Sequence, residues 1–498
     1  MRLLHSGFAI AVAAGLAQGF AQTLPDAPAP VPAAIPASLA QLAAPPRQSH
    51  SGGQPARKPL EVSRGATAAA MVTMFPHSLT SRYWISGQVN VISQGKPGFH
   101  AAYSGPNSLD NAPEDATSVL DTLFLGYQAE RNPRFNTDLL LDVEEAGGGG
   151  IGQALGLAGF TNLDVVRNPS LSQKPYLARA EIHQTFGLSG KLMPADRGPI
   201  SLATETPVRR IEIRAGKFSL PDIFDVNSVA SDSYHQFMNW TVDNNGAWDY
   251  AADTRGYTVG GAIEYDDHNW AVRYGFFAMP TAANEETLDW AFSRARGQNW
   301  ELDWNGSLLR GRRGAIRLLA YRNNAHMGNY RMAVQRYLAG ITPVPEIGPT
   351  ERFDTPKYGF GWNSEQEITR NLRMAARFGW NDDREESYCF TEVGQTAMVA
   401  GDYAGVRWRR PSDKAGVAFV SNAIKKDHQN YLKYGGLGFL LGDGGLDYGR
   451  EDIVESYYSW HVRRGFFLSL DDQHILHPGY NRVRGPVSVF SVRGHLDF

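Results

Sequence analysis

The sequence has little of what disulfide-stabilised proteins, thiol enzymes and nucleic-acid-binding proteins depend on. Its 498 residues include one cysteine, Cys389, so an intrachain disulfide is impossible. We interpret this thiol as a structural group in a loop, because no activating partner is near it in the sequence. The formal net charge is −3, which offers no excess of basic residues for nucleic acid. These features exclude disulfide scaffolds and argue against nucleic-acid binding.

Long apolar runs are also absent beyond the N-terminal region. A membrane-spanning helix needs about 20 consecutive apolar residues, and the mean hydropathy of −0.35 is that of a soluble protein. A membrane β-barrel is compatible with this average, because only every second residue of each strand faces lipid. Aromatic residues at 11% and 52 glycines favour that alternative.

Recognisable enzyme motifs are missing as well. There is no Gly-x-Ser-x-Gly elbow and no His-Glu-x-x-His zinc motif. The glycine run at 147–150 lacks the Lys-Ser/Thr ending of a phosphate-binding loop. A secreted glycosidase would need two carboxylates at a defined separation, and no pair stands out among the many Asp and Glu residues. We therefore predict no catalytic residue, no cofactor and no metal ligand.

The N-terminal region reads as a secretory leader. Arg2 supplies the positive start, 8–16 is a short apolar core, and 19–21 is a small-x-small cleavage site. The alternative, an N-terminal membrane anchor, is disfavoured because the apolar run is too short to span. We expect a signal peptide at 1–21, followed at 22–80 by a Pro/Ala-rich, disordered or polyproline-like periplasmic linker.

From Arg82 onward, short segments alternate apolar and polar residues with a period of two, which is typical of half-buried strands. In 371–382, for example, alternate apolar residues oppose Arg373 and Arg377. We expect an all-β fold over 81–498, a transmembrane antiparallel β-barrel of about sixteen strands. The expected strands are 82–93, 117–128, 135–145, 176–187, 208–218, 255–266, 268–279, 298–308, 314–323, 357–368, 371–382, 401–410, 414–422, 452–462, 465–474 and 486–498.

The connections between these segments alternate between short turns and long Gly/Pro/Asn-rich loops, except for the long connection at 188–207. This order is typical of an outer-membrane barrel, with periplasmic turns at one rim and extracellular loops at the other. The last segment ends on Phe498, which resembles the signal read by the barrel assembly machinery. The alternative is an ordinary edge strand, which a soluble protein would seldom leave uncovered.

Aromatic residues lie at many strand ends, where they suit girdles at the membrane interfaces. The residues expected in these girdles are Tyr83, Trp84, Tyr127, Tyr265, Trp270, Trp408 and Trp460. Sixteen strands would enclose a lumen wide enough for water.

Charges of both signs fall on the inward face of the expected strands. As pore-lining residues we predict Asp142, Glu144, Arg179, Glu181, His183, Arg214, Arg273, Glu301, Asp303, Arg317, Arg373 and Arg377, and the same pattern adds Arg210, Glu212, Glu365, Arg407, Arg493 and Asp497. Planar polar side chains form paired hydrogen bonds with sugars, so such a lumen could select sugars weakly. The alternative is that mixed charge only keeps the lumen wet and held by salt bridges.

Two of the long connections have an unusual composition. The loop 146–175 opens with four glycines and contains the apolar stretch 154–160, so we expect it either to fold into the barrel mouth or to pack against a neighbouring subunit. A second loop carries acidic residues that could attract cations at the pore mouth. These residues are Asp222, Asp225, Asp232, Asp243, Asp249 and Asp253.

The chain resembles the carbohydrate-selective outer-membrane porins of the OprB-like family. The matching passages are GFHAAYSGPNSL (98–109), ALGLAGF (154–160), RAGKFSLPDIFD (214–225), FMNWTVDNNGAWDYAADTRGYTVGGAIEY (237–265), GGLGFLLGDGGLDYGRE (435–451), ESYYSW (455–460) and QHILHPGYNRVRGPVSVFSVRGHLDF (473–498). The resemblance implies a sixteen-stranded pore through which monosaccharides and similar solutes diffuse. It carries over no catalytic residues, and some similar proteins are described as manganese porins.

Three functions therefore stand beside one another: a carbohydrate-selective porin, a divalent-cation porin of the same fold, and, least favoured, a secreted glycosidase. The expected location is the bacterial outer membrane. The expected partners are membrane lipid, small sugars or ions in transit, and the assembly machinery through Phe498, without nucleic acid. The sequence does not fix whether the protein forms a homo-oligomer.

Overall fold

The computed structural model describes residues 73–165, 171, 173–307, 309 and 311–498. The expected signal peptide and most of the expected linker lie outside these residues. The last residues before the barrel contact its rim: the Met74 N–H donates to the Asp497 carbonyl at 2.8 Å, and Arg464 Nε donates to the Thr73 carbonyl at 2.7 Å.

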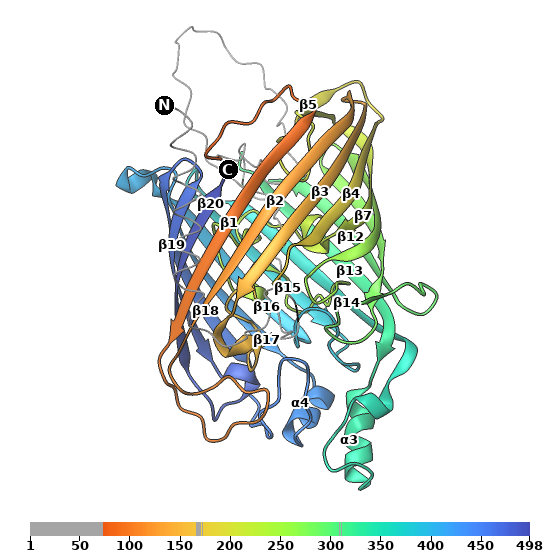
Figure 1. Cartoon of the computed structure of the whole chain (residues 1–498), viewed down its shortest axis with the longest axis vertical. Coiled ribbons are helices and arrows are strands. Elements are labelled where there is room, and N and C mark those ends of the chain that lie inside the picture. The colour runs from red at the N-terminus through yellow and green to blue at the C-terminus, as the bar shows by residue number, and fades with distance from the viewer. Residues whose placement is uncertain (1–72, 166–170, 172, 308, 310) are drawn as a thin grey trace.

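Sixteen antiparallel strands form one closed barrel, in which β1 pairs with β20 (Figure 1). The strands are β1 (Tyr83–Lys96), β2 (Glu114–Asn132), β3 (Phe135–Gly148), β4 (Tyr176–Gly187), β7 (Arg209–Phe218), β8 (Thr258–Asp267), β9 (Trp270–Phe277), β12 (Arg296–Gly306), β13 (Gly314–Met327), β14 (Arg352–Glu367), β15 (Leu372–Asn381), β16 (Gln395–Ala404), β17 (Lys414–Ala423), β18 (Glu451–Arg463), β19 (Phe466–Leu476) and β20 (Val487–Asp497). We call the rim where β1 begins and β20 ends the terminal rim, and the opposite one the loop rim.

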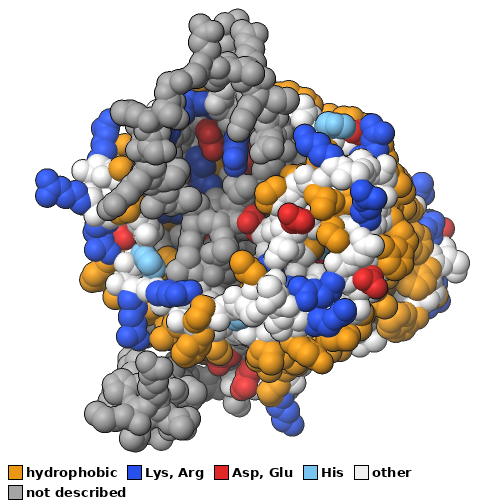
Figure 2. All heavy atoms as spheres, turned by 90° about the horizontal axis from the view of Figure 1, so that it is seen from above, with side chains coloured by type: hydrophobic (Ala, Val, Ile, Leu, Met, Phe, Trp, Pro, Cys, Tyr) orange, Lys and Arg blue, Asp and Glu red, His pale blue; other side chains and the backbone are white. Residues whose placement is uncertain are grey.

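The strands bury polar residues and expose apolar ones, the reverse of a soluble protein. In β12, Trp300, Leu302 and Trp304 are 41%, 46% and 38% exposed, whereas Glu301 and Asp303 between them are buried. Viewed onto the terminal rim, hydrophobic side chains cover the outer flank, and Lys and Arg gather nearer the rim (Figure 2). A closed sheet with this pattern satisfies its backbone groups internally and suits a lipid environment. In the described part of the chain, no helix has the length and apolarity needed to cross a membrane.

The predicted strands coincide with observed ones except for the segment 401–410, where the prediction was wrong. Strand β16 ends at Ala404, and Gly405–Trp408 forms a 3₁₀ helix, η4. Arg407 is therefore exposed near the terminal rim and does not line the lumen. The alternation was hidden because β16 turns the apolar residues Met398 and Ala400 inward, into the hydrophobic core.

Most of the expected girdle aromatics are exposed near the terminal rim, but Trp84 is a correction. Tyr83 and Trp270 are 64% and 39% exposed. Trp84 is only 4% exposed, stacks on His77 with ring centroids 4.2 Å apart, and donates a hydrogen bond from Nε1 to Ser86 Oγ at 2.7 Å. Its parity in β1 places it on the inward face, so it cannot belong to a lipid-facing girdle.

The long connections at the loop rim carry short elements of their own. These are η1 (Ile151–Ala154), η2 (Leu220–Asp222), α2 (Trp240–Asp243), β10 (Met279–Pro280), β11 (Leu288–Asp289), α3 (Tyr330–Leu338), η3 (Gly348–Thr350), α4 (Lys426–Lys433) and η5 (Pro478–Tyr480). Helices α3 and α4 project beyond the loop rim (Figure 1).

The long connection at 188–208, which departs from the alternation of short and long, lies at the terminal rim. It holds the two-stranded sheet of β5 (Leu192–Pro194) and β6 (Glu205–Pro207). Its Leu202 is buried against Trp84, Phe124 and Leu140, and the Leu202 N–H donates to Asp138 Oδ2 at 2.8 Å. The connection thus folds onto the inward face of the barrel.

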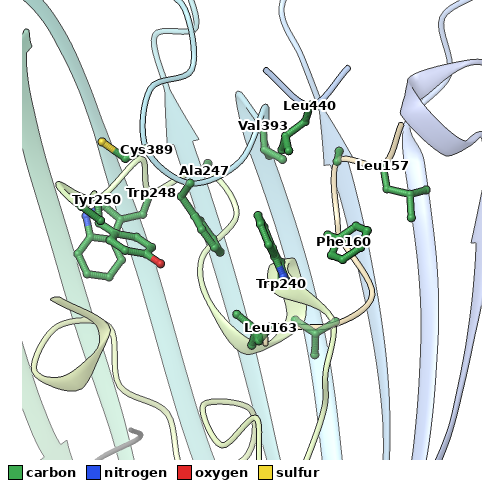
Figure 3. Packing of buried hydrophobic residues seen from close by; sticks show 14 of the residues in the cluster. Leu157, Phe160, Leu163, Trp240, Ala247, Trp248, Tyr250, Cys389, Val393 and Leu440 are labelled. Carbon is green, nitrogen blue, oxygen red and sulfur yellow. The ribbon is translucent and has the colours of Figure 1, made fainter. Parts of the chain in front are cut away.

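The hydrophobic core sits inside the barrel. Two segments contribute many of its residues: residues 149–165, which we call the glycine loop, and residues 219–257, which we call the inner loop. The expectation that the glycine loop folds into the barrel agrees with this placement, because Gln94 Nε2 of β1 and Gln473 Nε2 of β19 donate to the Thr161 carbonyl at 3.0 Å and 2.9 Å. Figure 3 shows Phe160 of the glycine loop beside Trp240 of the inner loop, with ring centroids 5.5 Å apart.

Candidate functional site

The inward side chains of β4, β7, β8, β9, β12 and β13, which we call the charged wall, form linked ion pairs. Alternation turns every second residue of these strands inward, and antiparallel pairing sets opposite charges side by side. Arg179 shows the principle: its Nε is 2.7 Å from Asp142, its Nη1 is 2.6 Å from Glu181, and its Nη2 contacts Asp222 of the inner loop. Arg214 then pairs with the other oxygen of Glu181.

The ion pairs continue around the wall to β14. Arg273 pairs with Glu264 and Glu301, and its Nη2 is 2.9 Å from Asp303. Arg317 Nη2 is in turn 2.8 Å from Glu365 of β14. Each guanidinium thus contacts carboxylates on neighbouring strands, and in this part of the wall two arginines face four carboxylates.

The structure places all twelve predicted pore-lining residues on strands, facing inward, but it buries most of them. Nine are at most 9% exposed: Asp142, Glu144, Arg179, Glu181, His183, Glu301, Asp303, Arg317 and Arg377. Arg214, Arg273 and Arg373 keep partly accessible side chains, at 12%, 15% and 16%. Glu212 and Glu264 add accessible carboxylates, at 16% and 18%. The accessible charges of the charged wall therefore lie on β7, β8 and β9.

The inward face of β16 and β17, which we call the packed wall, has a different character. Its Met398, Ala400, Ala418 and Val420 are buried in the hydrophobic core. Helix α2 of the inner loop contacts both strands. Trp240 of α2 stacks on Phe390 with ring centroids 5.4 Å apart and planes inclined by 12°. This side of the lumen is filled by protein.

Carboxylates on the inward face of the barrel hold the inner loop by accepting hydrogen bonds from its backbone. Glu301 Oε2 accepts from the Asp225 N–H at 2.6 Å, and Glu365 Oε2 accepts from the Ser228 N–H at 2.8 Å. Glu455 Oε1 of β18 accepts from the Met238 N–H at 2.6 Å and from the next amide. Such charge-assisted bonds satisfy buried amides that no strand can pair.

Arginines on the inward face of the barrel hold the same loop through its carbonyl groups. Arg377 Nη1 donates to the carbonyls of Val242 and Asp243 at 2.9 Å and 3.0 Å, and its Nε is 2.8 Å from the Asp225 carboxylate. Arg493 Nη2 of β20 donates to the Gln236 carbonyl at 2.9 Å. Carboxylates thus bind the N–H groups of the loop backbone, and guanidinium groups bind its carbonyl groups, from several sides of the barrel.

The acidic residues of the inner loop are largely paired, not free to draw in cations. Asp222 and Asp225 contact Arg179 and Arg377, as described above. Asp253 Oδ2 lies 3.5 Å from Lys217 Nζ, and Asp249 Oδ2 lies 2.8 Å from Lys357 Nζ. Burial raises the pKa of Asp222 to about 6, and Arg179 opposes that rise. Most of these aspartates therefore serve to attach the loop.

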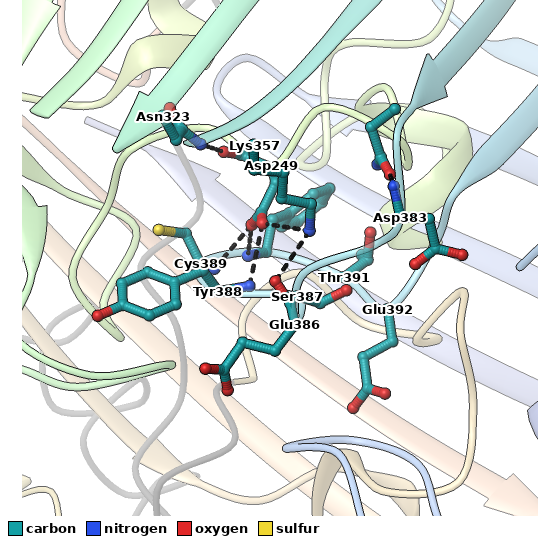
Figure 4. A network of polar contacts seen from close by, with 12 residues as sticks. Asp249, Asn323, Lys357, Asp383, Glu386, Ser387, Tyr388, Cys389, Thr391 and Glu392 are labelled. Carbon is teal, nitrogen blue, oxygen red and sulfur yellow. Dashed lines mark hydrogen bonds and ion pairs between the residues drawn. The ribbon is translucent and has the colours of Figure 1, made fainter. Parts of the chain in front are cut away.

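Asp249 is the clearest of these attachments (Figure 4). Its carboxylate accepts hydrogen bonds from three successive backbone N–H groups, those of Tyr388, Cys389 and Phe390, at 3.0, 2.7 and 3.2 Å. The inner loop is thereby tied to the connection 382–394. Burial raises the pKa of the Cys389 thiol, which agrees with the prediction of an unreactive structural cysteine.

Several residues that hold the inserted loops were not singled out from the sequence. Glu451 accepts from the N–H groups of Ala158, Gly159 and Gly479 at 3.0, 2.7 and 2.8 Å. Glu455 performs the same role for the inner loop. Both carboxylates share the parity of inward residues in β18, and that parity was the available signal. The sequence alone does not indicate which N–H groups of the loops these two carboxylates bind.

Comparisons with known proteins agree with this architecture. A family model described as carbohydrate-selective porin, OprB family, matches residues 135–498. The high-pH structure of Pseudomonas putida OprB superposes with a TM-score of 0.63 at 16% identity, covering 84% of this chain and 94% of that chain. The low-pH structure of the same protein gives 0.43 at 13% identity, covering 84% and 92%.

A porin triple mutant from Rhodopseudomonas blastica gives a TM-score of 0.40 at 11% identity, covering 84% of this chain and 100% of that chain. No individually curated protein matches the sequence. The family match spans most of the chain, from β3 to the end of the described barrel.

Proposed function

The chain belongs to the OprB family of carbohydrate-selective porins, and from this premise we propose that sugars cross the lumen along the accessible part of the charged wall. The protein is an outer-membrane β-barrel that conducts solutes and catalyses no reaction. Passage is passive diffusion of small sugars and other polar solutes, with membrane lipid around the barrel.

The observation that carries this path is the contrast in accessibility between the two walls. Glu212, Arg214, Glu264 and Arg273 keep accessible side chains on the inward face, while Met398 of the packed wall is buried. Of the other predicted pore-lining residues, Arg373 is also partly accessible. The buried ones act in this proposal by holding the charged wall and the inner loop in place.

Alternating guanidinium and carboxylate groups suit a neutral, hydroxyl-rich solute. A guanidinium donates and a carboxylate accepts, so adjacent groups can engage neighbouring hydroxyls of one sugar ring. The accessible part of the wall carries two guanidinium groups, Arg214 and Arg273, and two carboxylates, Glu212 and Glu264, which limits the net field that would favour ions. Binding must also be weak enough for the solute to leave.

Purified protein in planar bilayers tests this function. We expect stepwise ion conductance that falls when glucose or a maltose-type sugar is added, because a sugar at the charged wall displaces hydrated ions. Block by Mn²⁺ with no effect of any sugar would instead support the divalent-cation alternative. The absence of stepwise conductance would contradict a pore.

Assembly and orientation form a separate part of the proposal. We infer that the terminal rim faces the periplasm and that the assembly machinery binds β20 through Phe498. Two observations support a special role of this residue: the Phe498 N–H donates to the Gly87 carbonyl at 2.9 Å, and the Phe498 ring lies so close to Gly87 that a Cβ there would be 2.7 Å from it. Assembly of a Phe498→Ala variant in intact cells, followed by outer-membrane fractionation, tests this role, with reduced recovery expected.

A further inference from the structure

A separate group of polar residues lies where the barrel closes. His495 and Asp497 lie on β20, His235 lies in the inner loop, and all three side chains are buried. One ligand atom from each of the three side chains lies within 4.8 Å of the others. Nothing in the proposed sugar path requires this cluster.

The hydrogen bonds around His495 determine which of its nitrogens carries hydrogen. Its Nδ1 is 3.2 Å from Asn90 Oδ1, and Asn90 Nδ2 donates to Asp164 Oδ2 at 2.6 Å. The Asn90 amide oxygen must therefore face the ring, so Nδ1 is the donor. The lone pair of a neutral His495 then lies on Nε2, which is 3.1 Å from Asp497 Oδ1.

His235 is oriented in the same way from the opposite side. Its Nδ1 is 3.1 Å from Asp232 Oδ1, and its Nε2 is 3.4 Å from Asp497 Oδ2. A carboxylate only accepts hydrogen bonds, so a neutral His235 that donates from Nδ1 to Asp232 turns its Nε2 lone pair toward Asp497. In that tautomer the Nε2 lone pairs of both imidazoles point at the same carboxylate, an arrangement that a cation between them satisfies.

Protons or a metal ion can supply this positive charge. A proton added to His235 alone satisfies Asp232 and Asp497 but leaves the Nε2 lone pair of His495 against Asp497. Protonating both imidazoles would place two positive rings with centroids 4.7 Å apart in a buried site, where like charges repel strongly. One divalent metal ion satisfies both Nε2 atoms and Asp497 at once. The outer partners Asp232 and Asn90 correspond to the carboxylate and amide groups that orient metal-bound histidines elsewhere.

We propose that His235, His495 and Asp497 bind one divalent transition-metal ion of the zinc class. Two nitrogens and one carboxylate oxygen suit such an ion, whereas Mg²⁺ and Ca²⁺ prefer oxygen ligands alone. The fourth position of a tetrahedral zinc ion is left for water. The ion is a resident structural group, distinct from any solute in transit.

The location gives the ion a structural role at the closure of the barrel. Asn90 of β1 faces His495 of β20 across the last strand pair, and Gln88 faces Asp497. His235 adds the inner loop to this seam. The metal thereby joins the last strand and the inserted loop directly, and the first strand through the contact of Asn90 with His495. The sequence could not reveal this, because His235 lies 260 positions before His495, although His495 and Asp497 are two positions apart on one face of β20.

Zinc binding to the full chain, purified in detergent without a polyhistidine tag and stripped with a chelator, tests the proposal. We expect calorimetry to give one zinc ion per chain, and Co²⁺ to give the visible absorption of a tetrahedral N/O site. His235→Gln, which leaves the strands intact, should lose stoichiometric binding. Asp232→Asn should weaken binding by about 10- to 100-fold, as the loss of an orienting partner does.

His474→Gln serves as the matched control, because His474 is exposed on the outward face of β19. It should bind zinc as the wild type does. Zinc should also raise the melting temperature of the wild type and of this control, but not of His235→Gln. Absence of stoichiometric zinc in the wild type, or equal binding by His235→Gln, would overturn the proposal.

Discussion

The charged wall and the packed wall differ both in chemistry and in accessibility. On β7 to β9, arginines and carboxylates neutralise one another and keep some surface accessible. On β16 and β17, Met398 and Val420 are buried beneath the inner loop. The comparison shows that the inner face of one barrel has an accessible charged region and an apolar region covered by the protein's own inner loop. In the proposed function, the solute contacts the accessible charged region.

The largest effect should come from putting a charge into the packed wall. Val420 lies between Met398 and Ile453 on the neighbouring strands, and all three are buried. An arginine at Val420→Arg has no acidic residue directly opposite, and the diagonal carboxylates Glu451 and Glu455 already accept hydrogen bonds from loop amides. We therefore expect a loss on the order of 5 kcal/mol or more, from a poorly compensated buried charge and overpacking. Heat-modifiable migration on gels measures the loss of folded barrel.

The control for this variant is Ala271→Arg in the charged wall. Ala271 is also buried and inward, but it lies between Asp266 and Asp303 in the strand register. A new guanidinium there has carboxylate neighbours, so we expect a much smaller loss of stability. An equal loss of folded barrel in both variants would contradict the difference between the two walls.

The next effect concerns the attachment of the inner loop. Arg377→Gln removes the donors to the Val242 and Asp243 carbonyls and the partner of Asp225. We expect a destabilisation of about 3–5 kcal/mol, typical of breaking a buried ion pair, together with larger and noisier single-channel conductance as the loop loosens. Arg214→Gln, at an accessible position, should lower stability less. A quiet channel of unchanged size would contradict the role of Arg377 in holding the loop.

A change of selectivity should follow from unbalancing the charged wall. Arg273→Gln leaves Glu264, Glu301 and Asp303 without their shared guanidinium. We expect a several-fold rise in cation over anion permeability, measured by the reversal potential in a salt gradient, because an excess of wall carboxylates attracts cations. Arg331→Gln makes the same charge change on exposed α3 and should leave the reversal potential unchanged.

The smallest effect should arise outside both walls, at His428 of α4. Its ring stacks on Tyr330 with centroids 4.0 Å apart, and its Nδ1 and Nε2 are 3.0 Å and 3.2 Å from Asp383 and Glu392. Burial alone would lower the pKa of this imidazole, but the two carboxylates raise it from 6.5 to about 9.

A raised pKa in the folded state means that the stabilising charge is fully present below pH 6.5 and is lost as the pH rises through about 9. We therefore expect proteolysis of the connection 424–450 to accelerate across this range, with sugar block of the current unchanged. In His428→Gln the cleavage rate should not depend on pH in this window. A wild-type rate that is flat with pH would refute the assigned charge.

The same contrast explains how much the sequence could predict. Where the inward residues are charged, as with Glu301 and Asp303 beside Trp300 and Leu302, alternation marked the strand directly. Where they are apolar, as with Met398 in β16, both faces are apolar and the period of two disappears. That is why the strand was predicted at 401–410 and not at Gln395–Ala404.

The candidate site was predictable to the same extent. Parity identified which charges face inward, but not which ones the inner loop covers. Burial of Arg179 depends on Asp222, which lies more than forty positions away in the chain. The glycine loop was recognisable as too apolar for an exposed position. The inner loop, rich in Asp and Asn, looked like a solvent-exposed loop because its polar residues bind the wall and each other.

The most direct test of the division between the two walls is the accessibility of single thiols. In a Cys389→Ser background, Glu264→Cys and Met398→Cys place one thiol on each wall. Reaction with a charged, water-soluble thiol reagent should be fast for Glu264→Cys, reduce its conductance and be slowed by glucose, while Met398→Cys stays unreactive. Equal reaction at the two positions, or no protection by any sugar at Glu264→Cys, would contradict the account.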